Sequence, residues 1–317
     1  MIANLFIDRE GRLRSGWRFL IALVTLFAAF FVAEMLARGV SANVAIQNMI
    51  TRPVAAAIML AVFLWMSRVL DHAPDPAEYI GLGLGRRWGR DFGGGLLLGA
   101  VLVSACVAVI ALVGGYHLEP GPPITVSRWA AVGVVAWVFF FGAITEELGF
   151  RSYPFYRLIE SLGNLGALLP SEALKARARS IGAWSAILLL GGLFGAVHLS
   201  NPNATFWGFA NTVLIGVFFG LLMVRTGSLW LLWGLHFGWN FTLGALYGLP
   251  VSGINQFSVL WTGRAGGPTW LTGGAYGIEA SATASVFILL ALVVAIGLPA
   301  GAHAKATSGI QNGVAGS

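Results

Sequence analysis

The stretch Thr145-Glu146-Glu147-Leu148-Gly149-Phe150-Arg151 closes an apolar run that begins near Trp129, and it places two carboxylates and a guanidinium among Val, Ala, Phe and Gly. Inserting one ionised side chain into a membrane helix costs about 2.5–3.5 kcal/mol, so three together indicate a purpose. On a helix, Glu147 and Arg151 share a face in the favourable order for an ion pair. Glu146 points about 100° away. We therefore expect the pair to support a site in which Glu146 works; an ion-pair network that only locks helices together is the alternative.

Two further polar motifs lie on apolar runs. Phe194-Gly195-Ala196-Val197-His198 closes one run, and His236-Phe237-Gly238-Trp239-Asn240 lies within another. His236 and Asn240 are four residues apart, so both side chains project from one helix face. A single histidine or asparagine in such a helix is commonly a hydrogen-bonded packing residue. A carboxylate, two histidines and an amide together supply instead a general base, a proton shuttle and donors for an oxyanion.

In this order, the motifs Glu-Glu-x-x-x-Arg, Phe-x-x-x-His and His-x-x-x-Asn resemble those of the CPBP family of intramembrane proteases, which includes the CAAX prenyl endopeptidases and the bacterial Abi proteins. The resemblance covers about residues 125–250. It implies an endopeptidase acting on membrane-associated substrates, in which Glu146 and His198 activate a water. His236 and Asn240 would then face the oxyanion. The residues that would support this site are Glu147, Arg151 and Phe194.

The composition places these motifs in a membrane protein. Hydrophobic residues make up 57% of the chain and charged residues 10%, whereas a soluble domain is about 25% charged. The apolar runs predict an all-α fold, a polytopic bundle of about eight transmembrane helices. These runs cover residues 17–36, 49–70, 92–114, 129–151, 183–199, 205–224, 228–247 and 284–300.

The distribution of charge predicts the domain organisation and the orientation. We expect residues 1–16 to be a cytoplasmic segment, residues 17–300 to form one transmembrane protease domain, and residues 301–317 to be a flexible tail. Lys and Arg concentrate in the loops on the side of the N-terminus, which favours both termini inside. The predicted location is the inner (plasma) membrane, as a multi-pass protein. The expected partners are the lipid bilayer and a membrane-bound peptide or protein substrate, and no nucleic acid, because the basic residues are scattered through loops.

The connections between the runs carry three further expectations. Arg52, which precedes Pro53, is expected to reach towards the membrane interface. Gly95 and Gly99 are spaced for close helix approach. Ser171 to Arg179 would be a short amphipathic helix on the membrane surface or part of an ordinary solvated loop. The long segments expected to form turns or loops are 71–91, 115–127, 152–182 and 248–282.

The sequence leaves two questions open. Glu146, His198 and His236 could bind zinc, but the chain has no His-Glu-x-x-His motif and no set of cysteine ligands, so we favour a mechanism without a cofactor and keep zinc as the alternative. In another functional class, the same buried ionisable residues would suit a non-catalytic membrane scaffold or a proton-coupled transporter. A transporter would more often show paired repeats, and none is evident.

Overall fold

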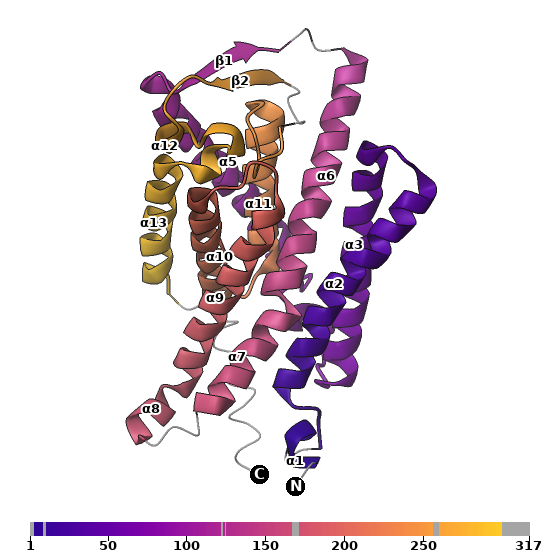
Figure 1. Cartoon of the computed structure of the whole chain (residues 1–317). Helices are drawn as coiled ribbons and strands as arrows, with labels where there is room; N and C mark the ends of the chain where they lie inside the picture. The colour runs from indigo at the N-terminus through magenta and orange to yellow at the C-terminus, as the bar shows by residue number, and fades with distance from the viewer. Residues whose placement is uncertain are drawn as a thin grey trace. The chain divides into compact units, whose positions relative to one another are not determined.

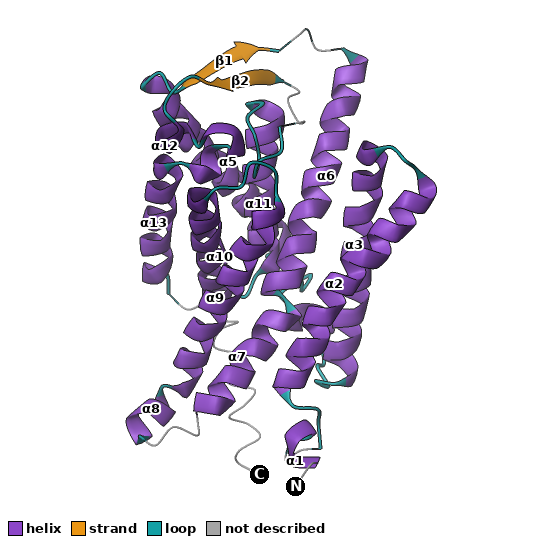
Figure 2. Ribbon diagram, viewed as in Figure 1, coloured by secondary structure: helices purple, strands orange, loops and turns teal. Residues whose placement is uncertain are grey.

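The computed structural model describes residues 3–8, 11–121, 123, 125–166, 171–255 and 260–299. These residues are mostly helical, with one two-stranded ribbon among them (Figure 2). The predicted all-α, polytopic character is therefore confirmed. The described residues form two compact units, one within Met1–Gly99, Pro122–Ala186 and Leu229–Phe241, the other within Ala100–Gly121, Ile187–Ser228 and Thr242–Ser317. The predicted tail at 301–317 lies outside the described residues.

The long helices follow the predicted apolar runs, and short helices lie between them. They are α1 (Ala3–Phe6), α2 (Ser15–Val40), α3 (Val44–Val69), α4 (Pro76–Tyr79), α5 (Trp88–Leu112), α6 (Val126–Arg151), α7 (Tyr153–Gly166), α8 (Glu172–Ala176), α9 (Ala178–Val197), α10 (Phe206–Thr226), α11 (Leu229–Phe241), α12 (Thr269–Thr272) and α13 (Ala282–Gly297) (Figure 1). Within the described ranges, six helical segments are long and apolar enough to cross a membrane. The helices α11 and α13 have only 13 and 16 residues, so the predicted count of eight spans is not confirmed.

A proline inside α3 fixes how this helix packs against α6 in the first unit. Pro53 has no N–H group, so the carbonyl of Met49 lacks the amide donor that a regular helix would supply. Trp137 of α6 donates its Nε1–H to that carbonyl oxygen at 3.0 Å. Eight residues further along α6, the hydroxyl of Thr145 donates to the carbonyl oxygen of Arg52 at 3.0 Å. These two bonds hold the middle of α3 beside the segment of α6 that carries the glutamates.

Glycines bring α5 and α11 into backbone contact. A Cβ on Gly95 would lie 2.1 Å from the carbonyl oxygen of Leu231, and a Cβ on Gly99 would meet that of Leu235 at the same distance. The contact is equally close from the side of α11, because a Cβ on Gly234 would lie 2.1 Å from the carbonyl oxygen of Phe92 in α5. The predicted close approach at Gly95 and Gly99 is thus confirmed. His236 is about 200° around the helix from Gly234, so the glycine face of α11 packs on α5 while His236 points the other way.

This contact predicts opposite results for two neighbouring glycines of α5. Gly95→Ala should destabilise the protein by about 1–3 kcal/mol, because the new methyl group has no room against α11. Gly94→Ala is the matched control: its Cβ would have no neighbour within 4 Å among the described residues. We expect this second change to be neutral or to stabilise α5 by up to about 1 kcal/mol. Thermal melting in detergent measures both, and equal melting of the two variants would contradict the close contact.

The segment predicted as a basic loop, 152–182, is mostly helical, so that prediction is wrong. It contains α7 and α8, and α9 begins before its end. Arg157 of α7 is buried, because its guanidinium bonds Asp71 Oδ1 at 2.7 Å, and the hydroxyl of Tyr153 donates to Asp71 Oδ2 at 2.6 Å. Arg18 of α2 pairs with the same aspartate. Arg157, which the sequence predicts to be exposed in a loop, is therefore paired with an aspartate more than eighty positions away. A short helix, α8, does lie within Ser171 to Arg179, and its place on the membrane surface stays a prediction.

The second unit contains secondary structure that the sequence analysis missed. Strand β1 (Tyr116–Pro120) pairs antiparallel with β2 (Trp261–Ala265), with Tyr116 opposite Ala265. The buried hydroxyl of Tyr116 donates to the carbonyl oxygen of Thr272 at 2.5 Å, and burial raises the pKa of this tyrosine, which keeps the donor protonated. The segments 115–127 and 248–282 are therefore not simple loops. The second also holds α12 and two short 3₁₀ helices, η3 (Gly274–Tyr276) and η4 (Ile278–Ala280).

Candidate active site

Glu147 and Arg151 form the ion pair that the helix spacing predicts. The Nη1 atom of Arg151 lies 3.5 Å from Oε1 of Glu147. Their side chains are 1% and 0% exposed, so the pair is fully enclosed in the first unit. A buried charge is tolerated when it is paired and hydrogen-bonded. Each residue therefore compensates the buried charge of the other, and the pair lies at the C-terminal end of α6.

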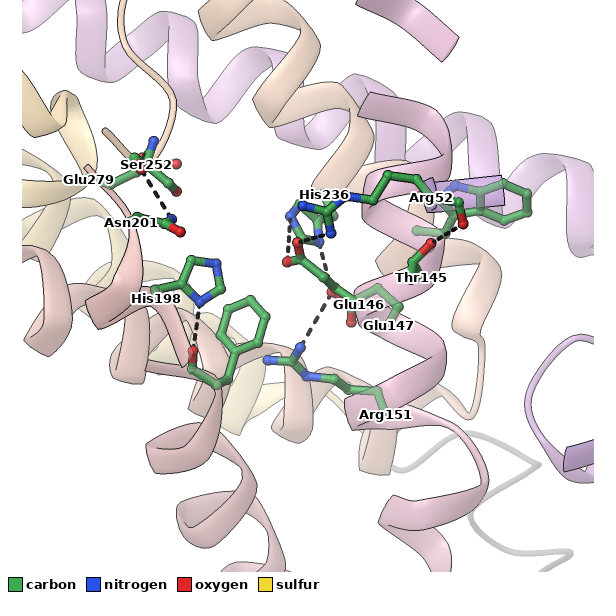
Figure 3. A network of polar contacts seen from close by, with 12 residues as sticks. Arg52, Thr145, Glu146, Glu147, Arg151, His198, Asn201, His236, Ser252 and Glu279 are labelled. Atoms are coloured by element: carbon green, nitrogen blue, oxygen red, sulfur yellow. Dashed lines mark hydrogen bonds and ion pairs between the residues drawn. The ribbon is translucent and has the colours of Figure 1, made fainter. Parts of the chain in front are cut away.

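His236 connects both glutamates to α11. Its Nδ1 atom lies 2.8 Å from Oε1 of Glu147, and its Nε2 atom lies 3.8 Å from Oε2 of Glu146 (Figure 3). A carboxylate oxygen accepts, so Nδ1 carries the proton in this bond. Glu147 thus orients the imidazole as well as holding Arg151. The sequence predicts only the pairing of Glu147 with Arg151, because the histidine approaches from a helix almost ninety residues later.

Glu146 has a cationic neighbour that the sequence analysis missed. The Nη1 atom of Arg52 lies 3.6 Å from Oε1 of Glu146 (Figure 3). The guanidinium of Arg52 lies against Glu146 and over the ring of Phe30, 5.3 Å from the centroid. Its predicted reach towards the membrane interface stays a prediction. The only sequence signal was an arginine followed by a proline within an apolar run. The side chain of Glu146 is 21% exposed, whereas that of Glu147 is fully buried, so Glu146 is the glutamate that a water can reach.

Asn240 lies one helical turn beyond His236 on the same side of α11. It is half-buried, and its side chain makes no hydrogen bond with any residue that the structure describes. An amide in such a position retains its donors for a bound molecule. The structure therefore groups Glu146, Glu147, Arg151 and His236 by direct contact and places Asn240 on the shared helix face.

His198 and Phe194 belong to the second unit. His198 follows the end of α9, and its Nδ1 atom is 2.7 Å from the carbonyl oxygen of Phe194 (Figure 3). Because a carbonyl oxygen only accepts, Nδ1 donates and Nε2 is the nitrogen that can take up a proton. The buried ring of Phe194 packs on the imidazole with 4.6 Å between centroids. Phe194 thus supports His198 as predicted, while the joint action of His198 and Glu146 stays a prediction.

A metal was the alternative reading of these side chains. Within the described part of the chain, no group of three or more His, Cys, Asp or Glu side chains is arranged to hold a metal ion. The Nδ1 atom of His236 is already engaged with Glu147, which leaves Nε2 as the atom that would bind zinc. The choice between a metal-free and a zinc mechanism stays a prediction.

Comparison with known proteins identifies one family. Residues 127–242 match the model of the Rce1-like family, described as type II CAAX prenyl endopeptidase Rce1-like. The matched segment contains the seven predicted site residues Glu146, Glu147, Arg151, Phe194, His198, His236 and Asn240, and it excludes Arg52. Comparisons with curated proteins and with solved structures gave no match.

Proposed function

We propose, from the match of residues 127–242 to the Rce1-like family, that this chain is an intramembrane endopeptidase of the CPBP/CAAX type that hydrolyses peptide bonds of membrane-associated substrates. The observation that carries the proposal is His236, which is hydrogen-bonded to the buried Glu147 and faces the partly exposed Glu146. A base that water can reach, next to an oriented imidazole, is the arrangement that general acid–base hydrolysis requires. The six long apolar helices give the substrate a bilayer setting.

In the proposed reaction, Glu146 removes a proton from a water while the water oxygen attacks the carbonyl carbon of the scissile peptide bond. The negative charge that develops on the carbonyl oxygen is stabilised by donors, for which we assign the side-chain amide of Asn240 and the Nε2–H of His236 in its doubly protonated form, in which Nδ1–H remains bonded to Glu147. The protonated Glu146 then gives its proton to the leaving amine as the carbon–nitrogen bond breaks. By the resemblance of its motif, His198 assists the activation of water.

The other side chains would position this machinery. Glu147 accepts a hydrogen bond from Nδ1 of His236 and so fixes the orientation of the imidazole ring. Arg151 balances the charge of Glu147 in its buried place. Arg52 stabilises the ionised carboxylate of Glu146 by its proximity.

A cleavage assay separates this function from the scaffold and transporter alternatives. The purified protein in detergent should cut a membrane-anchored peptide, and mass spectrometry of the products locates the bond. Peptides with a prenylated and an unmodified cysteine near the C-terminus test the substrate class that the family implies. The same protein in vesicles with an internal pH dye reports proton movement. Proton movement without cleavage would favour the transporter, and neither activity in a folded protein would favour the scaffold.

We further propose that the reaction needs no metal. Active protein should contain no stoichiometric zinc by elemental analysis, and prolonged chelation should leave its cleavage rate unchanged. The reason is that Glu146 and the water suffice as base and nucleophile once His236 and Asn240 stabilise the oxyanion. One zinc per chain that is lost together with activity would overturn the metal-free mechanism.

We propose an inner-membrane location with eight spans and both termini in the cytoplasm, a topology that single cysteines can test. Ser41 lies between α2 and α3, and His72 lies between α3 and α4. In a Cys106→Ser background, Ser41→Cys should react with a membrane-impermeant thiol reagent from the outside of cells. His72→Cys should react only in inverted vesicles, because positively charged loops remain in the cytoplasm. The reverse pattern would place the N-terminus outside.

A further inference from the structure

The turn after His198 is attached to a distant loop of the same unit. The backbone N–H of Asn201 donates to the carbonyl oxygen of His198 at 3.1 Å. The side-chain amide of Asn201 donates in turn to the carbonyl oxygen of Ser252, also at 3.1 Å (Figure 3). The segment that carries the histidine is therefore tied to the loop at Ser252 through one asparagine.

That loop has an enforced shape. Ser252 and Gly253 both adopt left-handed backbone angles, with φ of 47° and 85°. A left-handed conformation is costly for a residue other than glycine, so Ser252 needs compensating interactions. A Cβ at Gly253 would lie 1.8 Å from the carbonyl oxygen of Pro202, in the turn after His198. The two segments thus fit against each other with no room for a side chain.

A buried carboxylate supplies the compensation. Oε2 of Glu279 accepts the backbone N–H of Ser252 and, at 3.1 Å, its hydroxyl. Glu279 is only 5% exposed. Its own backbone is fixed by Asn211 of α10, whose amide donates to the carbonyl oxygens of Glu279 at 2.8 Å and of Ser281 at 2.9 Å. A charged acceptor buried in this way binds its donors more strongly than a neutral one would.

We propose that Glu279, Ser252 and Asn201 form a positioning network that sets the place of the His198 imidazole for proton transfer. The chain of contacts is continuous: Glu279 holds Ser252, Ser252 accepts from Asn201, and Asn201 donates to the backbone of His198. The inference rests on the proposed function, in which His198 assists the activation of water. Glu279 and Ser252 lie outside residues 127–242, so the family match does not assign them this role.

The test compares two variants of the turn. Asn201→Asp removes the amide donor to Ser252 and should lower kcat about tenfold or more with KM within about twofold, because a small displacement of a catalytic group has a large cost. Asn203→Asp is the matched control, since the amide of Asn203 makes only a 3.5 Å contact with the carbonyl oxygen of Gly253. It should change kcat less than about twofold. Glu279→Ala should behave like Asn201→Asp, and Glu279→Gln should recover most of the activity because its amide oxygen still accepts both donors.

A combination with His198→Ala distinguishes positioning from general destabilisation. If the network acts through His198, Asn201→Asp should cause no further loss in the His198→Ala background. An equal fall of the residual rate in both backgrounds would overturn the proposal. Equal kcat values for Asn201→Asp and Asn203→Asp would overturn it too.

A spectroscopic readout is independent of activity. In protein labelled with nitrogen-15 histidine, the ring signals that disappear in His198→Ala belong to His198. They should shift in Asn201→Asp and stay in place in Asn203→Asp, and unchanged signals in both would contradict the network. If His198→Ala itself retains full activity, the role proposed for His198 fails, while the ring signals still decide whether the network positions this residue.

Discussion

Replacement of Glu146 by glutamine is expected to lower kcat for peptide cleavage at least about a hundredfold, which is the usual contribution of a general base. The change keeps the size and polarity of the side chain but removes the ability to accept a proton from water. The fold should persist, because Glu147 carries the buried contacts to Arg151 and His236. Initial rates and thermal melting of the purified protein in detergent measure the two effects separately.

Glu34 provides the matched control for this change. Like Glu146 it is a glutamate on a long apolar helix beside an arginine, here Arg38 at 2.8 Å, but its side chain is 38% exposed and belongs to α2. Glu34→Gln should leave kcat unchanged. Full activity in a well-folded Glu146→Gln protein would remove Glu146 from the role of base, and Glu147 would become the candidate.

Replacement of Arg151 by alanine is expected to reduce stability by about 3–5 kcal/mol, the cost of stranding one charge of a buried pair. Glu147 is 0% exposed and would keep only its hydrogen bond to His236 among the contacts described for it. Denaturant or thermal unfolding in detergent measures the loss. Activity should fall at assay temperatures near the lowered melting point and should largely remain well below it.

The exposed pair of Arg38 and Glu34 is the control for burial. It has the same spacing of four residues, but its side chains are 61% and 38% exposed. Arg38→Ala should cost no more than about 0.5 kcal/mol, as exposed pairs on a helix do. A melting point that Arg151→Ala leaves unchanged, together with lost activity, would instead give Arg151 a part in the chemistry.

The features that the sequence predicts correctly are local ones. Glu147 and Arg151 sit on one helix, so a spacing of four residues fixes their contact. The same reasoning places Gly95 and Gly99 on one packing face and puts Asn240 beside His236. The family resemblance rests on three such local motifs, and the match over residues 127–242 agrees with it.

The features that the sequence missed depend on distant partners. Arg52 and Glu146 are 94 positions apart, and no local pattern in either segment predicts their contact. Arg157 was predicted to lie in a loop, but in the structure it is paired with Asp71 inside the first unit. Strand β1 contains His117, Glu119 and Pro120, a weak strand pattern that is extended only because β2 pairs with it. Helix α11 was predicted as part of a run over 228–247; its α-helical part ends at Phe241, and Thr242–Leu246 follow as a π-helix.

The measurement that tests the central claim most directly is cleavage of a membrane-anchored peptide in water enriched in oxygen-18, with protein in excess so that each chain turns over once. If Glu146 activates a water, the newly formed C-terminal carboxyl group of the product carries one oxygen-18 atom after the first turnover. Glu146 itself then remains unlabelled in the digested protein. Label in Glu146 would show a covalent acyl intermediate on this residue, and no product from folded protein would contradict the assignment as a protease.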